Sequence, residues 1–311
     1  MAEKVTHEPA EYIQALNING MRGRMLKAPA AKKTANREIL LIYGHHALLE
    51  RWWGLVENLQ DFGSVSMPDL PGFGGMDSFA KIGRKPTIDN YADYLAAFIK
   101  MTYKRRRITI VGISFGFVVA TRMLQKYPEM AKRVDLFVSM VGFMHRDDFL
   151  FTPKKQKFFR GATRVIATRP VAFVIRYVAL NKFVIRNIYS RLGAGKRRFL
   201  EMTPDNFDTL MDFEVRLWQA NDVRTHWLTT CEFLNLDNCK APIPLPIWHI
   251  YSSGDHYFNN DIVEQHMRVV FQDYGREVMQ SHAHTPSVLG NKEELAIMVP
   301  AGLRRQLRRK R

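Results

Sequence analysis

The stretch Arg107–Leu124 contains the residues best suited to chemistry. A β-branched run, Ile108–Val111, is followed by a Gly-x-Ser-x-Gly turn around Ser114 and then by an apolar helical stretch. The order strand, sharp turn, helix is the context in which a serine hydroxyl is lifted clear of a sheet and presented as a nucleophile. Gly112 and Gly116 suit this turn, because we expect a Cβ at either position to collide with the neighbouring strand or helix.

A serine nucleophile needs two partners from elsewhere in the chain. Its hydroxyl requires a base within hydrogen-bond reach, and the base requires an anion that fixes its tautomer and stabilises its charge. Asp255 directly follows an apolar strand-like run, and His284 lies further on. Two alternatives remain open at this point, Asp148 as the acid and His282 as the base. Asp255 also ends the run Ser-Ser-Gly-Asp, whose residue types favour a turn, so it could be a turn residue without a catalytic role.

The composition fits a globular core with a very uneven charge. The chain has 311 residues, 46% of them hydrophobic, and a formal net charge of +16. Arg146–Arg198 contains 14 Lys and Arg against Asp147 and Asp148, which is a net charge of +12. Residues 304–311 add six basic residues and no acid, which leaves −2 for the other 250. The basicity therefore belongs to one internal segment and to the C-terminal stretch, which is expected to be a solvated tail.

Several classes of protein are disfavoured by the pattern. The first residues contain acids and no apolar segment, and no uncharged apolar run is long enough to cross a membrane, so we expect neither a secretory signal nor a transmembrane helix. Cys231 and Cys239 match neither a zinc pattern nor a disulfide framework. No nucleic-acid-binding module accompanies the basic residues. The default expectation is a cytoplasmic protein.

The elements that must position these residues alternate between strand and helix. The apolar runs predict strands at Ile13–Asn19, Gly23–Lys27, Glu38–Gly44, Gly63–Met67, Ile108–Val111, Val134–Val141, Pro246–Ser252 and Glu277–Gln280. Helical spacing predicts helices around Leu55–Leu59, Tyr91–Ile99, the stretch after Ser114, Asp261–Phe271 and Lys292–Leu307. This alternation predicts an α/β fold, a doubly wound and mostly parallel sheet with helices on both faces.

The alternation stops at about Phe143 and resumes near residue 243. The segment between them has aromatic and basic residues and no convincing strand. We therefore predict a core made of residues 1–142 and 243–311, with a basic tail at 304–311, and a helical cap of residues 143–242 inserted before the last two strands.

Four motifs resemble the α/β-hydrolase family of serine hydrolases, of the esterase or lipase type. They are Leu40-Leu-Ile-Tyr-Gly-His45, Met67-Pro-Asp-Leu-Pro-Gly-Phe-Gly74, Gly112-Ile-Ser-Phe-Gly116, and the pair Ser253-Gly-Asp255 with His284-Thr-Pro286. The resemblance covers residues 38–142 and 243–303 and implies a triad of Ser114, Asp255 and His284. The family's His-x-Pro pattern favours His284 over His282.

The resemblance also implies an oxyanion hole built from the backbone amides of His45 and Phe115. The chain departs from the family at Tyr43, where histidine is common. The doublet His45-His46 has no nearby carboxylate to complete a metal site, so we expect no metal and no other cofactor. We expect four residues to line the substrate pocket, namely His46, Trp52, Phe143 and Tyr257.

These features predict an enzyme that cleaves a carboxylic ester with an apolar acyl or aromatic group. An acyltransferase, a carbon–carbon bond hydrolase, and a non-catalytic ligand-binding or membrane-associated protein on the same fold remain alternatives. The cap segment Arg169–Tyr189 is strongly apolar, with interruptions at Arg176, Lys182 and Arg186. It fits either a cap helix with snorkelling basic side chains or a basic amphipathic surface in peripheral contact with an anionic membrane.

Overall fold

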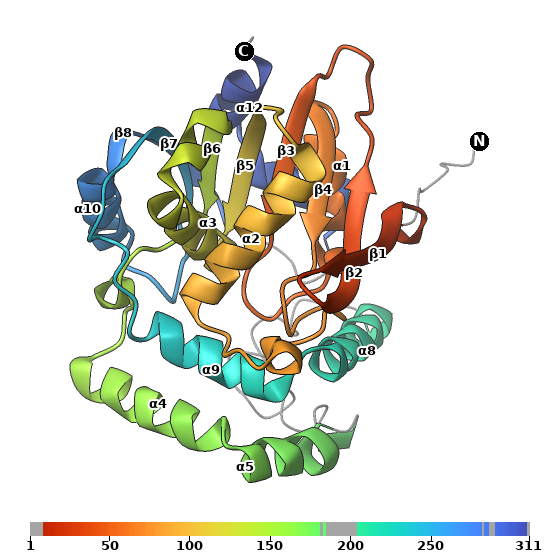
Figure 1. The fold of residues 1–311 in the computed structure, drawn as a ribbon, viewed down its shortest axis with the longest axis vertical. Helices are drawn as coiled ribbons and strands as arrows, with labels where there is room; N and C mark the ends of the chain where they lie inside the picture. Colours follow the sequence, from red (N-terminus) through yellow and green to blue (C-terminus); the bar gives the residue numbers. More distant parts are fainter. Residues whose placement is uncertain (1–8, 181–182, 185–203, 282, 286–289, 310–311) are drawn as a thin grey trace.

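The computed structural model describes residues 9–180, 183–184, 204–281, 283–285 and 290–309. Its centre is an eight-stranded sheet with the order β1-β2-β4-β3-β5-β6-β7-β8 (Figure 1). The strands are β1 (Ile13–Ile18), β2 (Met21–Ala28), β3 (Arg37–Ile42), β4 (Gly63–Pro68), β5 (Ile108–Ile113), β6 (Val134–Met140), β7 (Ile243–Ser252) and β8 (Phe271–Met279). The pairs β1/β2 and β2/β4 are antiparallel, and all later pairs are parallel.

The central strands are apolar along their whole length because both faces of the sheet are covered. All six residues of β5 are buried, as expected for a parallel strand between two helical layers. The covering helices are α1 (Trp53–Leu59), α2 (Ile88–Tyr103), α3 (Phe115–Lys126), α10 (Asn260–Val270), α11 (Lys292–Leu295) and α12 (Ala301–Arg308). In Figure 1, α2 and α3 lie together in front of the sheet, and α1 lies behind it. The predicted α/β class with a mostly parallel sheet is confirmed.

Two predicted elements near the C-terminus have different bounds. The last strand begins at Phe271, directly after α10, and not at Glu277. Polar residues hide this strand in the sequence because β8 is an edge strand and most of its residues are partly exposed. The predicted helix Lys292–Leu307 is broken into α11, a short 3₁₀ turn and α12, with Pro300 directly before α12. Proline lacks the N–H that a continuous helix needs at this position.

The predicted basic tail is a docked helix as far as Arg308. Leu303 and Leu307, on one side of α12, are buried in the core. The buried guanidinium of Arg37 donates to the carbonyl oxygens of Leu307 at 2.6 Å and of Arg309 at 2.9 Å. These contacts cap the C-terminal end of α12, so the interpretation of residues 304–308 as a solvated tail is wrong.

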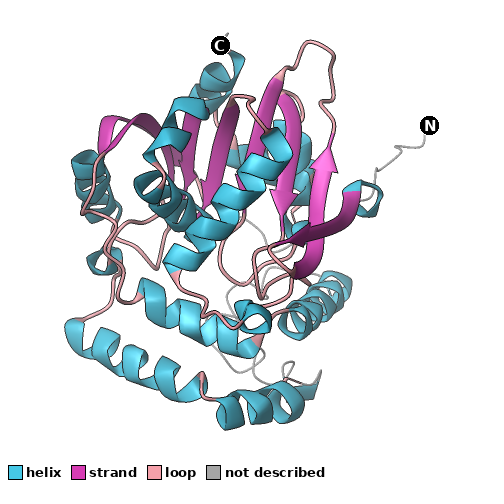
Figure 2. Cartoon of the chain, viewed as in Figure 1, coloured by secondary structure: helices cyan, strands magenta, loops and turns pink. Residues whose placement is uncertain are grey.

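Among its described residues, the segment between β6 and β7 consists of helices joined by loops and contains no named strand (Figure 2). Its helices are α4 (Pro153–Ile166), α5 (Arg169–Val174) with a continuing π-helical turn at Ile175–Ala179, α8 (Pro204–Ala220) and α9 (Val223–Phe233). In Figure 1, α9 lies next to the carboxyl ends of the central strands, and α4 and α5 form the outermost layer beyond it. None of the described helices is long and apolar enough to span a bilayer.

Candidate active site

Ser114 lies at the sharp turn between β5 and α3. Its backbone has φ 48° and ψ −114°, a conformation that costs energy for any residue with a Cβ. The flanking glycines let the turn close. A Cβ at Gly116 would lie 2.2 Å from the carbonyl oxygen of Ile42 in β3, and one at Gly112 would lie 2.6 Å from the Cα of Phe117. The strained turn is therefore held by close backbone contacts with the neighbouring strand and with its own helix.

The predicted serine, acid and histidine meet at the carboxyl edge of the sheet. Ser114 Oγ lies 3.1 Å from Nε2 of His284, and Nδ1 of His284 lies 2.6 Å from Oδ2 of Asp255. An ionised carboxylate can only accept, so Nδ1 of the neutral imidazole carries the proton and Nε2 is left to accept from the serine hydroxyl. The side chain of Asp255 is 2% exposed, which shields this contact from water.

The carboxylate of Asp255 is held in its charged form. Burial alone would raise its pKa, but the hydrogen bonds that it accepts, that of His284 first, outweigh burial and lower the pKa below the usual value. The backbone amides of Tyr257 and Phe258 also donate to Oδ1, at 2.9 and 3.3 Å. The loop after β7 therefore supplies both the carboxylate and the amides that orient it.

The alternative acid and base are placed differently. Asp148 is fully buried, and its Oδ1 pairs with Nδ1 of His266 on α10 at 2.5 Å. Its other oxygen accepts from the amides of Met144 and His145, which ties down the chain where it leaves β6. His282, like the proline of the His-x-Pro pattern, lies outside the described residues. Of the two aspartates, Asp255 is the one in contact with His284.

The two predicted oxyanion-hole residues flank the serine. Phe115 is the first residue of α3, so its amide has no acceptor within the helix. His45 follows β3 across the cavity, and both residues line the same cavity as Ser114. His45 and Phe115 therefore lie at the same cavity as the serine hydroxyl, which an oxyanion hole requires.

A cap helix holds the side chain of His45. Its Nε2 lies 2.7 Å from Thr229 Oγ1 and 3.2 Å from the carbonyl oxygen of His226, both on α9. Thr229 already donates its hydroxyl to the carbonyl of Thr225, so His45 is the donor in this contact. Burial lowers the pKa of His45 to about 4, which keeps the ring neutral. No pattern in the sequence indicates these α9 contacts.

His46 is fixed by the link between the two cap helices. Asn221, between α8 and α9, accepts from the amide of Gly74 with Oδ1 at 2.9 Å, so its nitrogen must donate to Nδ1 of His46 at 3.0 Å. The proton of this neutral ring is therefore on Nε2. Burial lowers the pKa of His46 well below its usual value. One asparagine thus connects the cap to two loops of the core.

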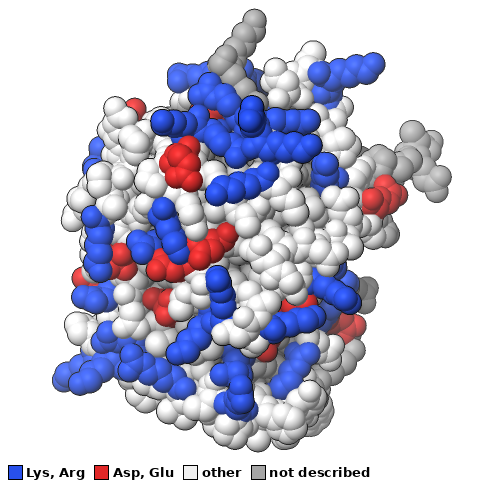
Figure 3. Space-filling view, in the orientation of Figure 1, with Lys and Arg blue, Asp and Glu red and all other residues white. Residues whose placement is uncertain are grey.

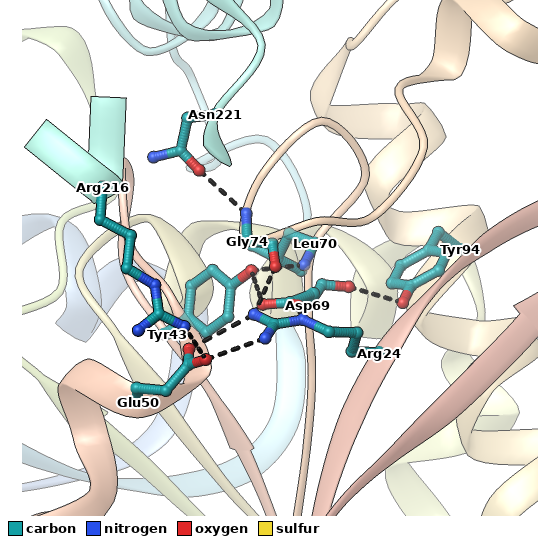
Figure 4. A network of polar contacts seen from close by, with 9 residues as sticks. All are labelled: Arg24, Tyr43, Glu50, Asp69, Leu70, Gly74, Tyr94, Arg216 and Asn221. Atoms are coloured by element: carbon teal, nitrogen blue, oxygen red, sulfur yellow. Dashed lines mark hydrogen bonds and ion pairs between the residues drawn. The ribbon is translucent and has the colours of Figure 1, made fainter. Parts of the chain in front are cut away.

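Tyr43, the residue that departs from the family pattern, belongs to a buried polar network (Figure 4). Its hydroxyl donates to Oδ1 of Asp69 at 2.9 Å and accepts from the amide of Leu70 at 2.7 Å. The other oxygen of Asp69 accepts from Arg24 Nε at 3.0 Å. The tyrosine thereby fixes the end of β3, next to His45, against the loop that begins with Asp69.

The same network extends to the cap through Glu50. Arg24 donates to Glu50 at 2.8 Å, and Arg216 of α8 donates to the same carboxylate oxygen at 3.1 Å. Burial would raise the pKa of Glu50, but the hydrogen bond from Arg24 and the charges of both arginines outweigh burial and lower it. Figure 4 shows the continuous path from Arg216 through Glu50 and Arg24 to Asp69.

A cavity of about 360 Å³ opens in front of the serine. All four residues predicted to line a substrate pocket contribute to its wall: His46, Trp52, Phe143 and Tyr257. Sequence reasoning missed the rest of the wall, which combines aromatic, aliphatic and polar side chains: Phe149, Phe233, Phe258, Leu217, Arg51, Glu214 and Thr285. Two of the aromatic rings, Phe143 and Phe258, stack with their centroids 4.5 Å apart. Within the described part of the chain, no group of three or more His, Cys, Asp or Glu side chains is arranged to hold a metal ion.

Comparison with known proteins agrees with the fold and the motifs. The chain belongs to the alpha/beta hydrolase fold family, whose model matches residues 39–275. A curated relative, the biotin biosynthesis bifunctional protein BioHC of Teredinibacter turnerae, is 24% identical over 291 residues. The match covers 89% of this chain and 46% of that protein, so this chain spans about half the length of the relative.

Solved structures resemble this one over nearly the whole chain. A thermophilic esterase from Thermogutta terrifontis superposes with a TM-score of 0.64 and 16% identity, covering 96% of this chain and 98% of the esterase. An epoxide hydrolase of Bacillus megaterium gives a TM-score of 0.66 with 14% identity, covering 95% of this chain and 100% of that protein. At such low identities the structural likeness establishes the fold only, and the reaction has to be inferred from the geometry of the site.

Proposed function

We propose that this protein is a serine hydrolase that cleaves a carboxylic ester through a covalent acyl-enzyme. The observation that carries the proposal is the unbroken hydrogen-bond chain from Ser114 Oγ to His284 Nε2 and from His284 Nδ1 to Asp255. The base is within reach of the hydroxyl proton, and the anion stabilises the imidazolium that forms when the proton moves.

In the first half of the reaction, Ser114 Oγ attacks the ester carbonyl carbon while its proton passes to Nε2 of His284. The negative charge that develops on the carbonyl oxygen is stabilised by the amides of His45 and Phe115. His284 then returns the proton to the leaving alkoxide, so that an alcohol departs and the acyl group stays on Ser114. In the second half, water loses a proton to His284 and attacks the acyl carbon. His284 then gives this proton to Ser114 Oγ as the Oγ–acyl bond breaks, which releases the acid and restores the enzyme.

The cavity wall supports an apolar acyl or aromatic group as the part of the substrate that is recognised. Phe143, Phe149, Phe233 and Phe258 line the cavity, and their rings contact one another. A cavity of about 360 Å³ is at the small end of typical ligand pockets and suits a compact substrate. Burial of such a group against the rings supplies binding energy and excludes water from the reacting carbonyl.

The proposal is tested with p-nitrophenyl esters of increasing acyl length. Ser114→Ala should lower kcat by about 10³-fold or more, because the nucleophile is lost while the cavity remains. His266→Asn is the matched control, since it removes a histidine in an Asp–His pair outside the cavity. Full activity of Ser114→Ala, or a wild-type protein that turns over none of the esters, would contradict the proposal.

A further inference from the structure

The outermost helix of the cap exposes a row of large apolar side chains. Phe173 and Val174 at the end of α5, and Tyr177 and Val178 in the following π turn, are between 54% and 70% exposed. The spacing i, i+1, i+4, i+5 places all four on one side of the helix. The opposite side, represented by buried Ala172, packs toward the rest of the cap. Such a row is costly in water and marks an interaction surface.

The neighbouring helix α4 continues this surface and adds positive charge. Its exposed stripe combines Phe158 and Val165 with the basic residues Lys154, Lys157 and Arg164. The positions recur every three or four residues, so they lie on one side of the helix. Both α4 and α5 contact α9 with their other sides, and their exposed sides therefore face away from it. We call these two stripes, together with Arg169, the cap outer face.

The composition of the cap outer face is unusual for this molecule. Of the twelve large hydrophobic side chains exposed among the described residues, eight lie between Leu150 and Phe183. The sequence from 149 to 200 contains no Asp or Glu. Figure 3 shows Lys and Arg side chains over the lower edge of the molecule, where α4 and α5 lie, with uncharged surface between them. Exposed apolar groups and uncompensated positive charge thus occupy the same face.

Arg176 does not belong to this face, although its sequence position suggested a snorkelling or membrane-facing side chain. Its guanidinium is half-buried and donates to the carbonyl oxygens of Trp218 at 2.9 Å and of Gln219. These carbonyls are at the C-terminal end of α8, where a cation is favourable. Arg176 therefore joins α5 to α8. Lys182 and Arg186 lie outside the described residues.

We propose that the cap outer face docks on the surface of an anionic lipid membrane. Aromatic and aliphatic side chains surrounded by lysine and arginine are the combination that inserts shallowly at the boundary of headgroups and acyl chains. The basic residues add electrostatic attraction to anionic headgroups. A second copy of the chain fits less well, because a two-fold contact would bring the positive charges of both copies together. This proposal does not depend on the proposed esterase activity.

The test is co-sedimentation of the full chain with vesicles of phosphatidylcholine alone or with about one third phosphatidylglycerol. We expect binding to the anionic vesicles and a steep loss as salt rises, because screening weakens the attraction of surface charges beyond roughly 10 Å at 0.1 M salt. The variant Phe173→Ser/Tyr177→Ser should bind about tenfold more weakly, since it removes apolar surface. Its control is Met101→Ser/Val269→Ser, which changes two exposed apolar residues of the core and should bind like wild type.

A second pair of variants separates local charge from net charge. Lys154→Gln/Lys157→Gln/Arg164→Gln removes three charges from the cap outer face, and Lys27→Gln/Arg105→Gln/Lys132→Gln removes three exposed charges from the core. The cap triple should reduce binding by at least about tenfold more than the core triple. Circular dichroism checks that all variants are folded.

Three results would overturn the proposal. The first is no binding to anionic vesicles at low salt. The second is equal loss in the cap and core triples, which would indicate net charge alone. The third is a dimer in solution that Phe173→Ser/Tyr177→Ser dissociates, which would show that a second copy covers the face.

Discussion

The guanidinium of Arg216, on cap helix α8, lies 3.1 Å from the carboxylate of Glu50, five positions after His45 in the sequence. The same carboxylate is bound by Arg24, whose second partner is the buried Asp69. The position of the cap and the conformation of the loop after β3 are therefore connected by ion pairs. Because His45 belongs to that loop, we expect a change in cap contacts to lower the rate of ester cleavage more than it lowers the stability of the core.

Arg216→Gln tests this connection. The Arg216 side chain is 62% exposed, so its ion pair contributes at most about 1 kcal/mol and the melting temperature should change little. We expect kcat/KM for an activated ester to fall by about fivefold, the rate equivalent of that energy. Arg84→Gln is the matched control, because Arg84 forms a comparably exposed pair with Asp93 at 3.9 Å far from the cavity. Equal kinetics for the two variants would show that the cap does not position the loop.

Tyr43→Phe should be strongly destabilising. The hydroxyl satisfies a buried carboxylate oxygen of Asp69 and a buried amide, and each unsatisfied group costs about 1–3 kcal/mol. We expect the free energy of unfolding in urea to drop by about 3 kcal/mol. Tyr91→Phe, whose buried hydroxyl donates to the neutral carbonyl of Pro71 at 2.7 Å, should cost about 1 kcal/mol. A loss at Tyr43 no larger than that at Tyr91 would argue against a structural role for the Asp69 contact.

The central part of the site could be predicted because its signals are local. The turn around Ser114 needs small residues on both sides, and the strand and helix that flank it are long apolar runs. Asp255 and His284 each follow a late strand, and parallel strands end at the same edge of a sheet. The contact between these residues follows from this topology without knowledge of side-chain packing.

Contacts between the cap and the core could not be predicted in this way. Thr229 and Asn221 are ordinary helical and linker residues in the sequence, yet they bind His45 and His46. Their role depends on how α8 and α9 lie across the carboxyl edge of the sheet, and helical periodicity does not encode that placement. The bounds of the edge strand β8 and the helix break at Pro300 could not be predicted either. Most residues of β8 are partly exposed and polar, and the break depends on the N–H that Pro300 lacks.

We expect a buried histidine of the core to make the folded protein less stable as the pH is lowered. His249 in β7 is buried beside Ser139, and burial lowers its pKa from 6.5 to about 3. Between these two values the unfolded chain binds a proton that the folded chain does not, so lowering the pH favours unfolding. From pH 7 to pH 5 this residue should cost about 2 kcal/mol of stability. His249→Gln should therefore show a shallower pH dependence of urea unfolding, and an unchanged slope would contradict the assignment.

The two neighbouring histidines should differ in activity. His284→Ala should lower kcat by about as much as loss of the serine, because members of a triad act as a unit. His282→Ala should retain most of the activity, and it serves as the control at nearly the same sequence position. Steady-state kinetics with a p-nitrophenyl ester measures both. The opposite result would move the base two residues upstream.

The most direct test of the account is covalent labelling with a fluorophosphonate probe, followed by mass mapping of the modified peptide. An activated serine displaces fluoride and keeps the phosphonyl group, whereas a serine without a working base reacts poorly. We predict one labelled site, at Ser114, with labelling lost in Ser114→Ala and strongly slowed in His284→Ala. A folded protein that hydrolyses esters while Ser114 stays unlabelled, or that carries the label on another residue, would contradict the central claim.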